Sequence, residues 1–359
     1  MSQMKLKSIA VICNYEINEN RIGGMDRFFK AFDTQAKKEG YTVHWFFKGH
    51  EMFDFYKGLD IVFSKAESVE SLFLSHLKNN MTAYTYVITH FVELCSPFYK
   101  EAKLKTNAYC IAVDHNPRPL EGFPVKKRLK LKIKGLIYGR YIDSFIGVSK
   151  YTAEHILKDY GNFLKPKVHV IYNGIDTSLF KKREIANTNR FIVASHLRPS
   201  KGIQDLLKAL SLVPHKLKSN MLVDIYGEGP IENELRQNCT ELGLDSVVTF
   251  KGSSSQLHCL FCNYSYMIQP TYMECFSLSI LESLSANVPV ITTQVGGNME
   301  VIEDGVNGYI FQAGDISELK TIFSEILTGE RAIISTVDEN IKKNYSIERM
   351  VREHIKLLV

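Results

Sequence analysis

Strand-like apolar runs alternate with helical patterns along almost all of the 359 residues. In the first half the runs are Ser8–Tyr15, Thr42–Phe47, Asp60–Phe63, Tyr84–Thr89, Ala108–Val113, Asp143–Val148 and Val168–Ile171. In the second half they are Arg190–Ser195, Met221–Tyr226, Val247–Phe250, Tyr264–Ile268, Val288–Thr292 and Tyr309–Phe311. Strands that alternate with helices predict parallel sheets with helices on both faces. We therefore expect an α/β protein of two doubly wound domains that face each other across a cleft.

The polar segment Lys181–Asn189 separates the two halves, and we interpret it as a linker. The expected domains are residues 1–180 and 181–340, followed by residues 341–359, whose helix is expected to pack back on the first domain. A hydrophobic content of 45% fits two globular domains, although the length alone also allows one large barrel.

The cysteines and the apolar segments limit the cellular setting. The seven cysteines show no pairing pattern, and Cys259-Leu-Phe-Cys262 lacks the second pair that a zinc site needs. The longest uncharged stretch, Gly252–Met273, holds too many polar residues to span a membrane. Residues 1–7 run directly into a strand without a signal-peptide pattern. We expect a cytoplasmic protein that is peripheral on the inner face of the cell membrane.

Two glutamates stand eight residues apart in Pro270-Thr-Tyr-Met-Glu274-Cys-Phe-Ser-Leu-Ser-Ile-Leu-Glu282. Glu274 falls between a strand and the predicted helix Phe276–Ala286, where free backbone N–H groups attract anions. Glu282 falls about two turns into that helix, close to the same face. An arbitrary pair of this spacing is more simply two solvated helix charges. Here the strand end, and the Gly296-Gly297 loop after the next strand, favour a site for a ligand with phosphates and hydroxyls, such as a nucleotide sugar.

Several short motifs accompany the two glutamates in a defined order. They are Ile22-Gly23-Gly24-Met25-Asp26-Arg27, Val148-Ser149-Lys150, Asn173-Gly174-Ile175-Asp176, Lys201-Gly202, Gly227-Glu228-Gly229-Pro230 and Ala286-Asn-Val-Pro-Val-Ile-Thr. Together the set resembles the retaining glycosyltransferases of family 4, also called glycosyl transferases group 1, over nearly the whole chain. The resemblance implies the GT-B fold, two Rossmann-like domains of which the first binds the acceptor and the second the nucleotide diphosphate sugar.

The resemblance also implies roles for individual residues of the second domain. Glu282 would hold the ribose hydroxyls, and Glu274 would lie near the donor sugar as a catalytic residue. Gly227 would line the donor site. The backbone amides that would contact the sugar or the β-phosphate are those of Phe276, Ser277 and Leu278.

Phosphate neutralisation needs cations, which the family places in the pattern G-R-L-x-x-x-K-G. This chain reads Ser195-His-Leu-Arg-Pro-Ser-Lys-Gly202 over the same stretch. Lys201 matches the family lysine, His196 stands where the family has Arg, and Arg198 is the nearest replacement. Which of His196 and Arg198 takes the phosphate-binding role stays open.

The first domain carries two candidate sites at strand ends. Gly23-Gly24 follows the first strand; it suits an ordinary turn, but the resemblance places this position at the donor phosphate. Asp114-His115 ends a later strand, and His115 is the first choice for the residue that faces the reacting sugar, with Asp114 as the alternative. A buried structural role would suit a lone histidine equally well. His90 is a weaker candidate on the acceptor side.

Two absent motifs exclude other chemistry from the prediction. The chain contains no G-x-G-x-x-G, so dinucleotide binding is not supported. It contains no Asp-x-Asp either, and we expect neither a catalytic metal nor any other cofactor.

Positive charge concentrates in one segment. Residues 118–140 hold eight Lys and Arg against the single acid Glu121, while the whole chain is +5. Pro124 suits a helix start, and apolar residues from Leu129 to Tyr141 repeat at helical spacing, although a strand also fits the Leu-Lys alternation. A core-packed helix with a solvated face is one interpretation; attraction to an anionic membrane is the other. The candidate membrane or acceptor residues are Lys126, Lys127, Arg128, Lys130, Lys132 and Lys134.

The sequence therefore predicts a retaining hexosyltransferase that moves a sugar from a nucleotide diphosphate sugar, UDP in preference to GDP, to a hydroxyl of a glycan or lipid-linked glycan. Assembly of cell-surface polysaccharide, lipopolysaccharide or another glycan would use such an enzyme. A nucleotide-sugar epimerase of the same architecture is an alternative, and so is a non-catalytic membrane or nucleic-acid binding module. We expect no nucleic-acid partner, because the chain shows no base-stacking aromatic platform.

Overall fold

The computed structural model describes residues 7–19, 22–64, 67–80, 82–184 and 189–358. The chain divides into two compact units: Met1–Gly174 with Ile347–Val359, and Ile175–Ser346. The first boundary therefore falls after residue 174 rather than 180. The second falls after residue 346 rather than 340.

The predicted linker Lys181–Asn189 is part of the second unit over residues 181–183. The backbone N–H of Arg183 donates to the carbonyl of Ala286 at 2.8 Å, and the Arg183 guanidinium donates to the carbonyl of Ser265. Arg183 is buried, so this stretch is packed rather than free. Residues 185–188 of the predicted linker lie outside the described residues.

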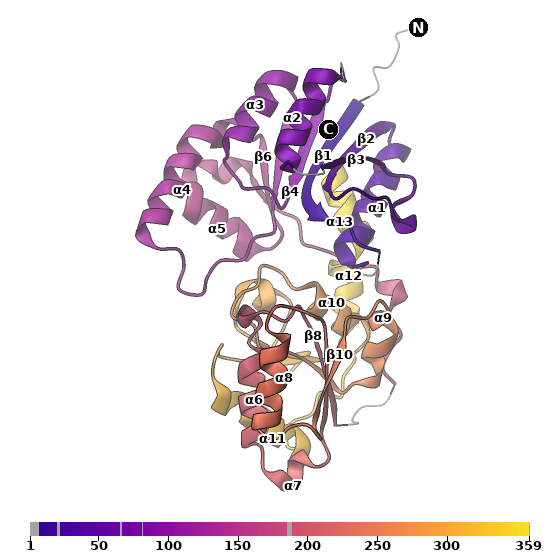
Figure 1. Cartoon of the computed structure of the whole chain (residues 1–359), viewed down its shortest axis with the longest axis vertical. Coiled ribbons are helices and arrows are strands. Elements are labelled where there is room, and N and C mark those ends of the chain that lie inside the picture. Colours follow the sequence, from indigo (N-terminus) through magenta and orange to yellow (C-terminus); the bar gives the residue numbers. More distant parts are fainter. Residues whose placement is uncertain (1–6, 20–21, 65–66, 81, 185–188, 359) are drawn as a thin grey trace. The chain divides into compact units, whose positions relative to one another are not determined.

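The first unit is built on a seven-stranded parallel sheet in the order β3-β2-β1-β4-β5-β6-β7 (Figure 1). Its strands are β1 (Lys7–Glu16), β2 (Tyr41–Lys48), β3 (Asp60–Ser64), β4 (Tyr86–His90), β5 (Tyr109–Asp114), β6 (Ser144–Gly147) and β7 (Val168–Val170). Its helices are α1 (Gly24–Lys38), α2 (Val69–Asn79), α3 (Pro97–Thr106), α4 (Val125–Tyr138), α5 (Lys150–Tyr160) and α13 (Ile347–Ile355). Short 3₁₀ turns are η1 (Asp54–Tyr56), η2 (Gly139–Tyr141) and η3 (Asn162–Lys167).

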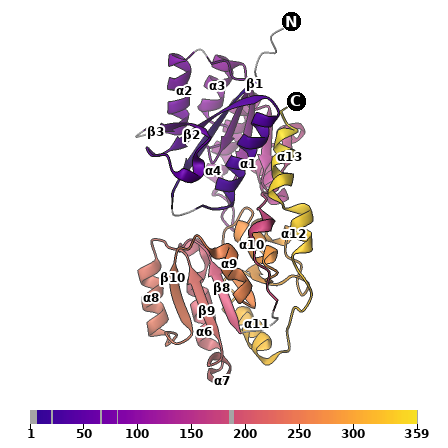
Figure 2. The ribbon, with the colours of Figure 1, turned by 90° about the vertical axis from the view of Figure 1, so that its right-hand side faces the viewer.

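Helices cover both faces of this sheet. Helices α2, α3, α4 and α5 pack with Ala10, Ile12 and Phe145 in one core cluster. Helices α1 and α13 lie together on the other face (Figure 2). There the Phe29 ring contacts Trp45 and the Phe28 ring contacts His354. The centre of β1 is fully buried on both faces, as is typical of parallel sheets.

The second unit repeats the plan with a six-stranded parallel sheet in the order β10-β9-β8-β11-β12-β13. Its strands are β8 (Arg190–Ala194), β9 (Leu222–Tyr226), β10 (Val248–Gly252), β11 (Tyr266–Gln269), β12 (Val290–Thr293) and β13 (Gly308–Phe311). Its helices are α6 (Ile203–Leu212), α7 (His215–Lys218), α8 (Glu232–Glu241), α9 (Leu257–Leu260), α10 (Leu278–Ser285), α11 (Ile316–Thr328) and α12 (Glu339–Asn344). Its 3₁₀ turns are η4 (Thr177–Leu179), η5 (Pro199–Lys201), η6 (Phe261–Asn263) and η7 (Gly296–Glu300).

The prediction of two doubly wound α/β domains is confirmed, and every predicted run overlaps one of the strands. In each sheet the strand order reverses once, between β1 and β4 and between β8 and β11. Open sheets of this kind bind ligands beyond the carboxyl ends of the strands at such a switch point. The loops that follow β8 and β11 therefore lie where this fold places a ligand.

Candidate functional site

Lys201 and Glu274 form an ion pair in the loops beyond β8 and β11. The Lys201 Nζ donates to the Glu274 Oε2 at 2.8 Å, and the two side chains are 22% and 13% exposed. The other carboxylate oxygen, Glu274 Oε1, accepts from the backbone N–H of Cys275 at 3.1 Å. A lysine ammonium has three N–H donors and a carboxylate about four acceptor positions, so each group keeps capacity for a ligand. The pair thus offers a cation and an anion side by side.

Hydrogen bonds between the two loops fix this pair in place. The carbonyl of Ser200 accepts from the backbone N–H of Tyr272 at 2.8 Å and from the Thr271 hydroxyl at 3.1 Å. The Tyr272 hydroxyl donates to Asp205 at 2.6 Å, which ties the same loop to the first turn of α6. Lys201 and Glu274 therefore belong to one hydrogen-bonded unit rather than to two independent loops.

Two glycines permit the backbones to approach this closely. Gly202 has φ +70°, and a Cβ there would lie 1.8 Å from the carbonyl oxygen of Pro270. Gly296 has φ +62°, and a Cβ there would lie 2.0 Å from the carbonyl oxygen of Glu274 itself. Only glycine combines a left-handed φ with that separation. Gly296 thus lets its loop lie against the Glu274 backbone, and the N–H of Gly297 donates to the carbonyl of Cys275 at 3.1 Å.

Helix α10 begins at Leu278, two residues later than the predicted Phe276. Ser277 is in extended conformation and its hydroxyl accepts from the backbone N–H of Ile280, which makes it the N-cap. Gln269, the last residue of β11, donates to the Ser277 hydroxyl at 2.6 Å. Glu282 is consequently little more than one turn into α10 and is half-buried. The helix N-terminus and both glutamates still belong to the same strand-loop-helix connection.

The remaining predicted donor residues also lie beyond the strand ends of the second unit. His196 and Arg198 are exposed in the loop after β8, and Arg198 directly precedes η5. Gly227 follows β9 and donates its N–H to the carbonyl of Gly252 at 2.9 Å. Phe276 is buried, and Leu278 is half-buried.

In the first unit, the buried acid Asp26 binds the backbone of Gly23, a contact that the sequence motif does not reveal. The Asp26 carboxylate accepts from the Gly23 backbone N–H at 2.7 Å and from the hydroxyls of Tyr15 and Tyr56. Burial raises the pKa of Asp26, while these hydrogen bonds act in the opposite direction. Gly24 is the first residue of α1. Hydrogen bonds to the buried Asp26 therefore hold the loop after β1 in place.

His115 and Asp114 are both buried, and they have different partners. The His115 Nε2 lies 3.0 Å from the His90 Nδ1, and burial lowers the pKa of His115 to about 3. The Asp114 carboxylate accepts from Arg118 at 2.8 Å and from the backbone N–H of Asn116 at 3.0 Å. Asp114 is thereby committed to an internal ion pair, which leaves His115 as the better candidate of the two.

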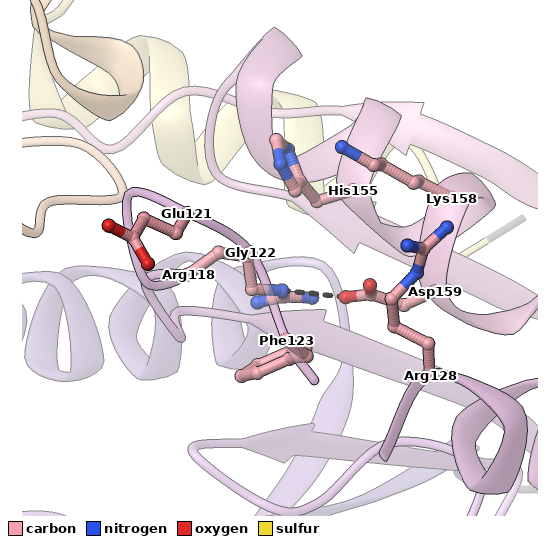
Figure 3. Close-up of a pocket in the computed structure, with 8 residues that line it drawn as sticks. All are labelled: Arg118, Glu121, Gly122, Phe123, Arg128, His155, Lys158 and Asp159. Atoms are coloured by element: carbon pink, nitrogen blue, oxygen red, sulfur yellow. Dashed lines mark hydrogen bonds and ion pairs between the residues drawn. The ribbon is translucent and has the colours of Figure 1, made fainter. Parts of the chain in front are cut away.

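Arg118 joins two acids in the interior of the first unit. Its Nη2 donates to Asp114 and its Nε donates to Asp159, each at 2.8 Å, and all three side chains are buried. Figure 3 shows Arg118 and Asp159 at the base of a pocket that Phe123, Arg128, His155 and Lys158 also line. Burial by itself lowers the pKa of Arg118, but the two neighbouring acids together outweigh burial and raise it. Only the fold reveals this triad, because its members are spread from residue 114 to residue 159.

The six basic candidates all lie on α4, which confirms the helical interpretation of that segment over the strand. Lys134 is half-buried and pairs with Glu93, whereas the other five are exposed. No helix in the described part of the chain is long and apolar enough to cross a membrane.

Two family models match consecutive parts of the chain. "Glycosyltransferase Family 4" matches residues 22–179, and "Glycosyl transferases group 1" matches residues 175–345. The chain is 29% identical over 201 residues to an MMP alpha-(1->4)-mannosyltransferase of Mycolicibacterium hassiacum, covering 54% of this chain and 47% of that protein. It is 26% identical over 192 residues to the lipopolysaccharide 1,6-galactosyltransferase of Escherichia coli K12, covering 50% and 52%. The matches thus span about half the length of these relatives.

A solved structure matches the fold over nearly the full length. HepE of Anabaena, in complex with UDP and glucose, superposes with a TM-score of 0.77 at 19% identity, covering 98% of this chain and 99% of that chain. At this identity the likeness concerns the fold.

Proposed function

Because the chain belongs to the group 1, family 4 glycosyltransferases of the GT-B fold, we propose that it transfers a sugar from a UDP-sugar to a hydroxyl of a glycan or lipid-linked glycan, with retention. The observation that carries the proposal is the Lys201–Glu274 ion pair beyond the carboxyl ends of β8 and β11. A diphosphate needs a cation, and a sugar ring needs hydrogen-bond acceptors for its hydroxyls. The pair supplies both within a few ångströms.

Each residue of the site has a place in this scheme. Two N–H groups of Lys201 remain for diphosphate oxygens, and the first amides of α10 add the positive end of a helix dipole. Glu274 accepts hydroxyl hydrogens of the transferred sugar, and Glu282, further along α10, accepts those of the ribose. Arg198 or His196 supplies a second cation. The bound UDP and glucose of HepE, and the glycan-directed names of the relatives, favour these substrates.

The proposed reaction breaks the bond between the anomeric carbon and the β-phosphate oxygen. The acceptor oxygen forms its new bond to the anomeric carbon on the face that the diphosphate leaves, so the configuration is retained. The acceptor proton passes to the departing phosphate oxygen. Lys201 and the helix amides stabilise the negative charge that accumulates on the diphosphate, and no catalytic metal is required.

A donor screen tests the proposal. The protein is incubated with a panel of UDP-sugars and GDP-sugars, and release of nucleoside diphosphate and the shift in thermal unfolding midpoint are measured. A ligand at a hundred times its Kd stabilises the folded state by about 2.7 kcal/mol, which is easily detected. We expect a UDP-sugar to give both signals, and we expect EDTA to change neither of them. The proposal is wrong if no nucleotide sugar gives either signal, or if the donor sugar is inverted at C2 without an acceptor, as an epimerase requires.

A further inference from the structure

Helix α4 exposes a row of aliphatic side chains that the core-packed interpretation of this segment would bury. Their exposed fractions are 76% for Val125, 63% for Leu129, 47% for Ile133, 66% for Leu136 and 46% for Ile137. At roughly 100° per residue these five positions fall within an arc of about 120° on the helix surface. The core-packed interpretation of the repeat from Leu129 to Ile137 is therefore wrong. We call these five residues the α4 stripe.

The opposite side of α4 makes the contacts that hold the helix in this orientation. Leu131 is 6% exposed and belongs to the core cluster of the first unit. A Cβ added to Gly135 would lie only 2.1 Å from the carbonyl oxygen of Tyr160 at the end of α5, so the two backbones touch there. Rotating α4 to bury its stripe would bring a larger side chain into that contact. The exposure of the stripe is thus a consequence of tight packing on the other face.

Lysines border the α4 stripe on both sides. At the same angular step, Lys130 lies just beyond the edge of the arc that Ile137 marks, and Lys132 lies just beyond the opposite edge. Lys126 lies inside the arc, next to Ile137. Within the described residues these three ammonium groups form no hydrogen bond or ion pair. Helix α4 carries six Lys and Arg and no acid. An exposed aliphatic surface is here framed by uncompensated positive charge.

We propose that α4 docks the chain onto an anionic lipid bilayer, with the α4 stripe inserted among the acyl chains and the lysines at the headgroup phosphates. Lysine stems are apolar and let the ammonium groups reach the phosphates while the helix lies in the interface. The 14 residues of α4 span about 21 Å, which suits a helix lying parallel to the surface.

Other partners fit the α4 stripe less well. A second copy of the chain would bring two strongly basic helices together, which like-charge repulsion opposes. Nucleic acid would pair with the lysines and leave the aliphatic side chains against a polar backbone. The lipid proposal does not depend on the proposed sugar transfer, because binding to vesicles is measured without any nucleotide sugar.

Vesicle sedimentation tests the apolar half of the proposal. The full chain is mixed with phosphatidylcholine vesicles, with or without phosphatidylglycerol, and the bound fraction is measured at low and high salt. We expect binding that requires phosphatidylglycerol and weakens at high salt. The double variant Leu129→Ser, Leu136→Ser should lose at least about tenfold in affinity. The matched control Leu212→Ser, Ile334→Ser removes two exposed residues of the second unit and should bind as the wild type does.

A second variant tests the charged half. Lys126→Gln, Lys130→Gln and Lys132→Gln together should weaken binding by about a hundredfold, since each cation near an anionic surface contributes about fivefold. The control changes Lys208, Lys216 and Lys343 of the second unit to Gln. Circular dichroism of each variant verifies the fold. Binding that persists in both α4 variants, or no binding to phosphatidylglycerol at low salt, overturns the proposal. Self-association that is lost in Leu129→Ser, Leu136→Ser would instead assign the stripe to a second copy.

Discussion

Lys201 and Glu274 are 73 positions apart in the chain, and the Lys201 Nζ lies 2.8 Å from the Glu274 Oε2. The local structure around either residue does not bring the two side chains together. The contact depends on β8 and β11 being neighbours in the sheet, and on the Ser200 carbonyl that binds the loop carrying Glu274. Much of the proposed activity therefore depends on a relationship that sheet order creates.

Glu274→Gln should reduce turnover while leaving the fold intact. A hydrogen bond to a charged group contributes about 1.5–3 kcal/mol, which corresponds to a roughly ten- to hundredfold lower kcat. The measurement is release of UDP at saturating donor, alongside the thermal unfolding midpoint. Glu234→Gln, on the exposed face of α8, is the matched control. Equal kcat values in the two variants would remove Glu274 from the site.

Lys201→Gln should weaken donor binding while changing the free energy of unfolding much less. The substitution keeps a polar side chain near Glu274 but removes the positive charge that the diphosphate needs. We expect the Kd for UDP, measured by calorimetry, to rise by about tenfold or more, in keeping with the loss of a charge-assisted hydrogen bond. Lys216→Gln, an exposed lysine of α7, should leave the Kd unchanged. An unaltered Kd in Lys201→Gln would contradict its proposed role.

Gly296→Ala should displace the Glu274 backbone. The new Cβ would meet the Glu274 carbonyl oxygen at 2.0 Å and would also occupy a left-handed conformation. Gly243 provides a control, because its φ of +64° is almost the same and nothing lies within 4 Å of an added Cβ. Both variants carry the conformational cost of about 1 kcal/mol, so any further loss in Gly296→Ala reports the clash. We expect kcat for donor turnover to fall in Gly296→Ala alone; similar activity in both would contradict the supporting role.

Acid should destabilise the first unit through a cluster of buried histidines. Burial lowers the pKa of His354 to about 4, and it lowers those of His90 and His115 as well. The Nδ1 of His354 bonds to the carbonyl of Met350, and its Nε2 is buried without a partner among the described residues. Protons then bind the unfolded state more readily, so stability present above about pH 6.5 is lost as the pH falls toward about 4.

Urea unfolding from neutral pH to about pH 5 measures this effect. His354→Met should flatten the decline, and the difference reaches about 2 kcal/mol at pH 5, since that pH lies about 1.5 units below the ordinary histidine pKa and still above the folded pKa of about 4. Other charges act on the cluster: Glu353 raises the pKa of His354, whereas His354 lowers those of His90 and His115. His169→Met, an exposed residue of β7, should keep the wild-type slope. Identical slopes in both variants would show that His354 does not carry the acid response.

Arg118→Met should destabilise the first unit severely. Asp114 and Asp159 would be left buried without their shared cation, and breaking a buried pair in this way costs about 3–5 kcal/mol. Arg128→Met changes an exposed arginine of the same pocket (Figure 3) and should be nearly neutral. The midpoints of urea unfolding of the two variants are compared with that of the wild type. Equal midpoints would mean that the triad contributes nothing measurable.

Much of the candidate site could be predicted from local sequence. Gly227, Lys201, Glu274 and Ser277 all occur at strand ends or helix starts, which apolar runs and short motifs mark directly. The start of α10 was predicted two residues early, because the apolar pattern continues through Phe276 while the Ser277 hydroxyl makes the cap. Asp26 and Arg118 were missed as anchors. Nothing local distinguishes a buried acid with three donors from an ordinary helix charge.

The sequence by itself determined the alternating strands and helices of two parallel sheets and the order of the motifs, because backbone periodicity and turn residues act over a few positions. It favoured a helix over a strand for α4 for the same reason. Tertiary structure alone decided which polar groups meet. It pairs Lys201 with Glu274, gives Asp114 to Arg118, and places Gly296 under the Glu274 carbonyl. It also decided which side of α4 is buried. That helix has two apolar faces, and periodicity cannot rank them. The contact between Gly135 and Tyr160 selects one face for the core and leaves the other, with its lysines, exposed.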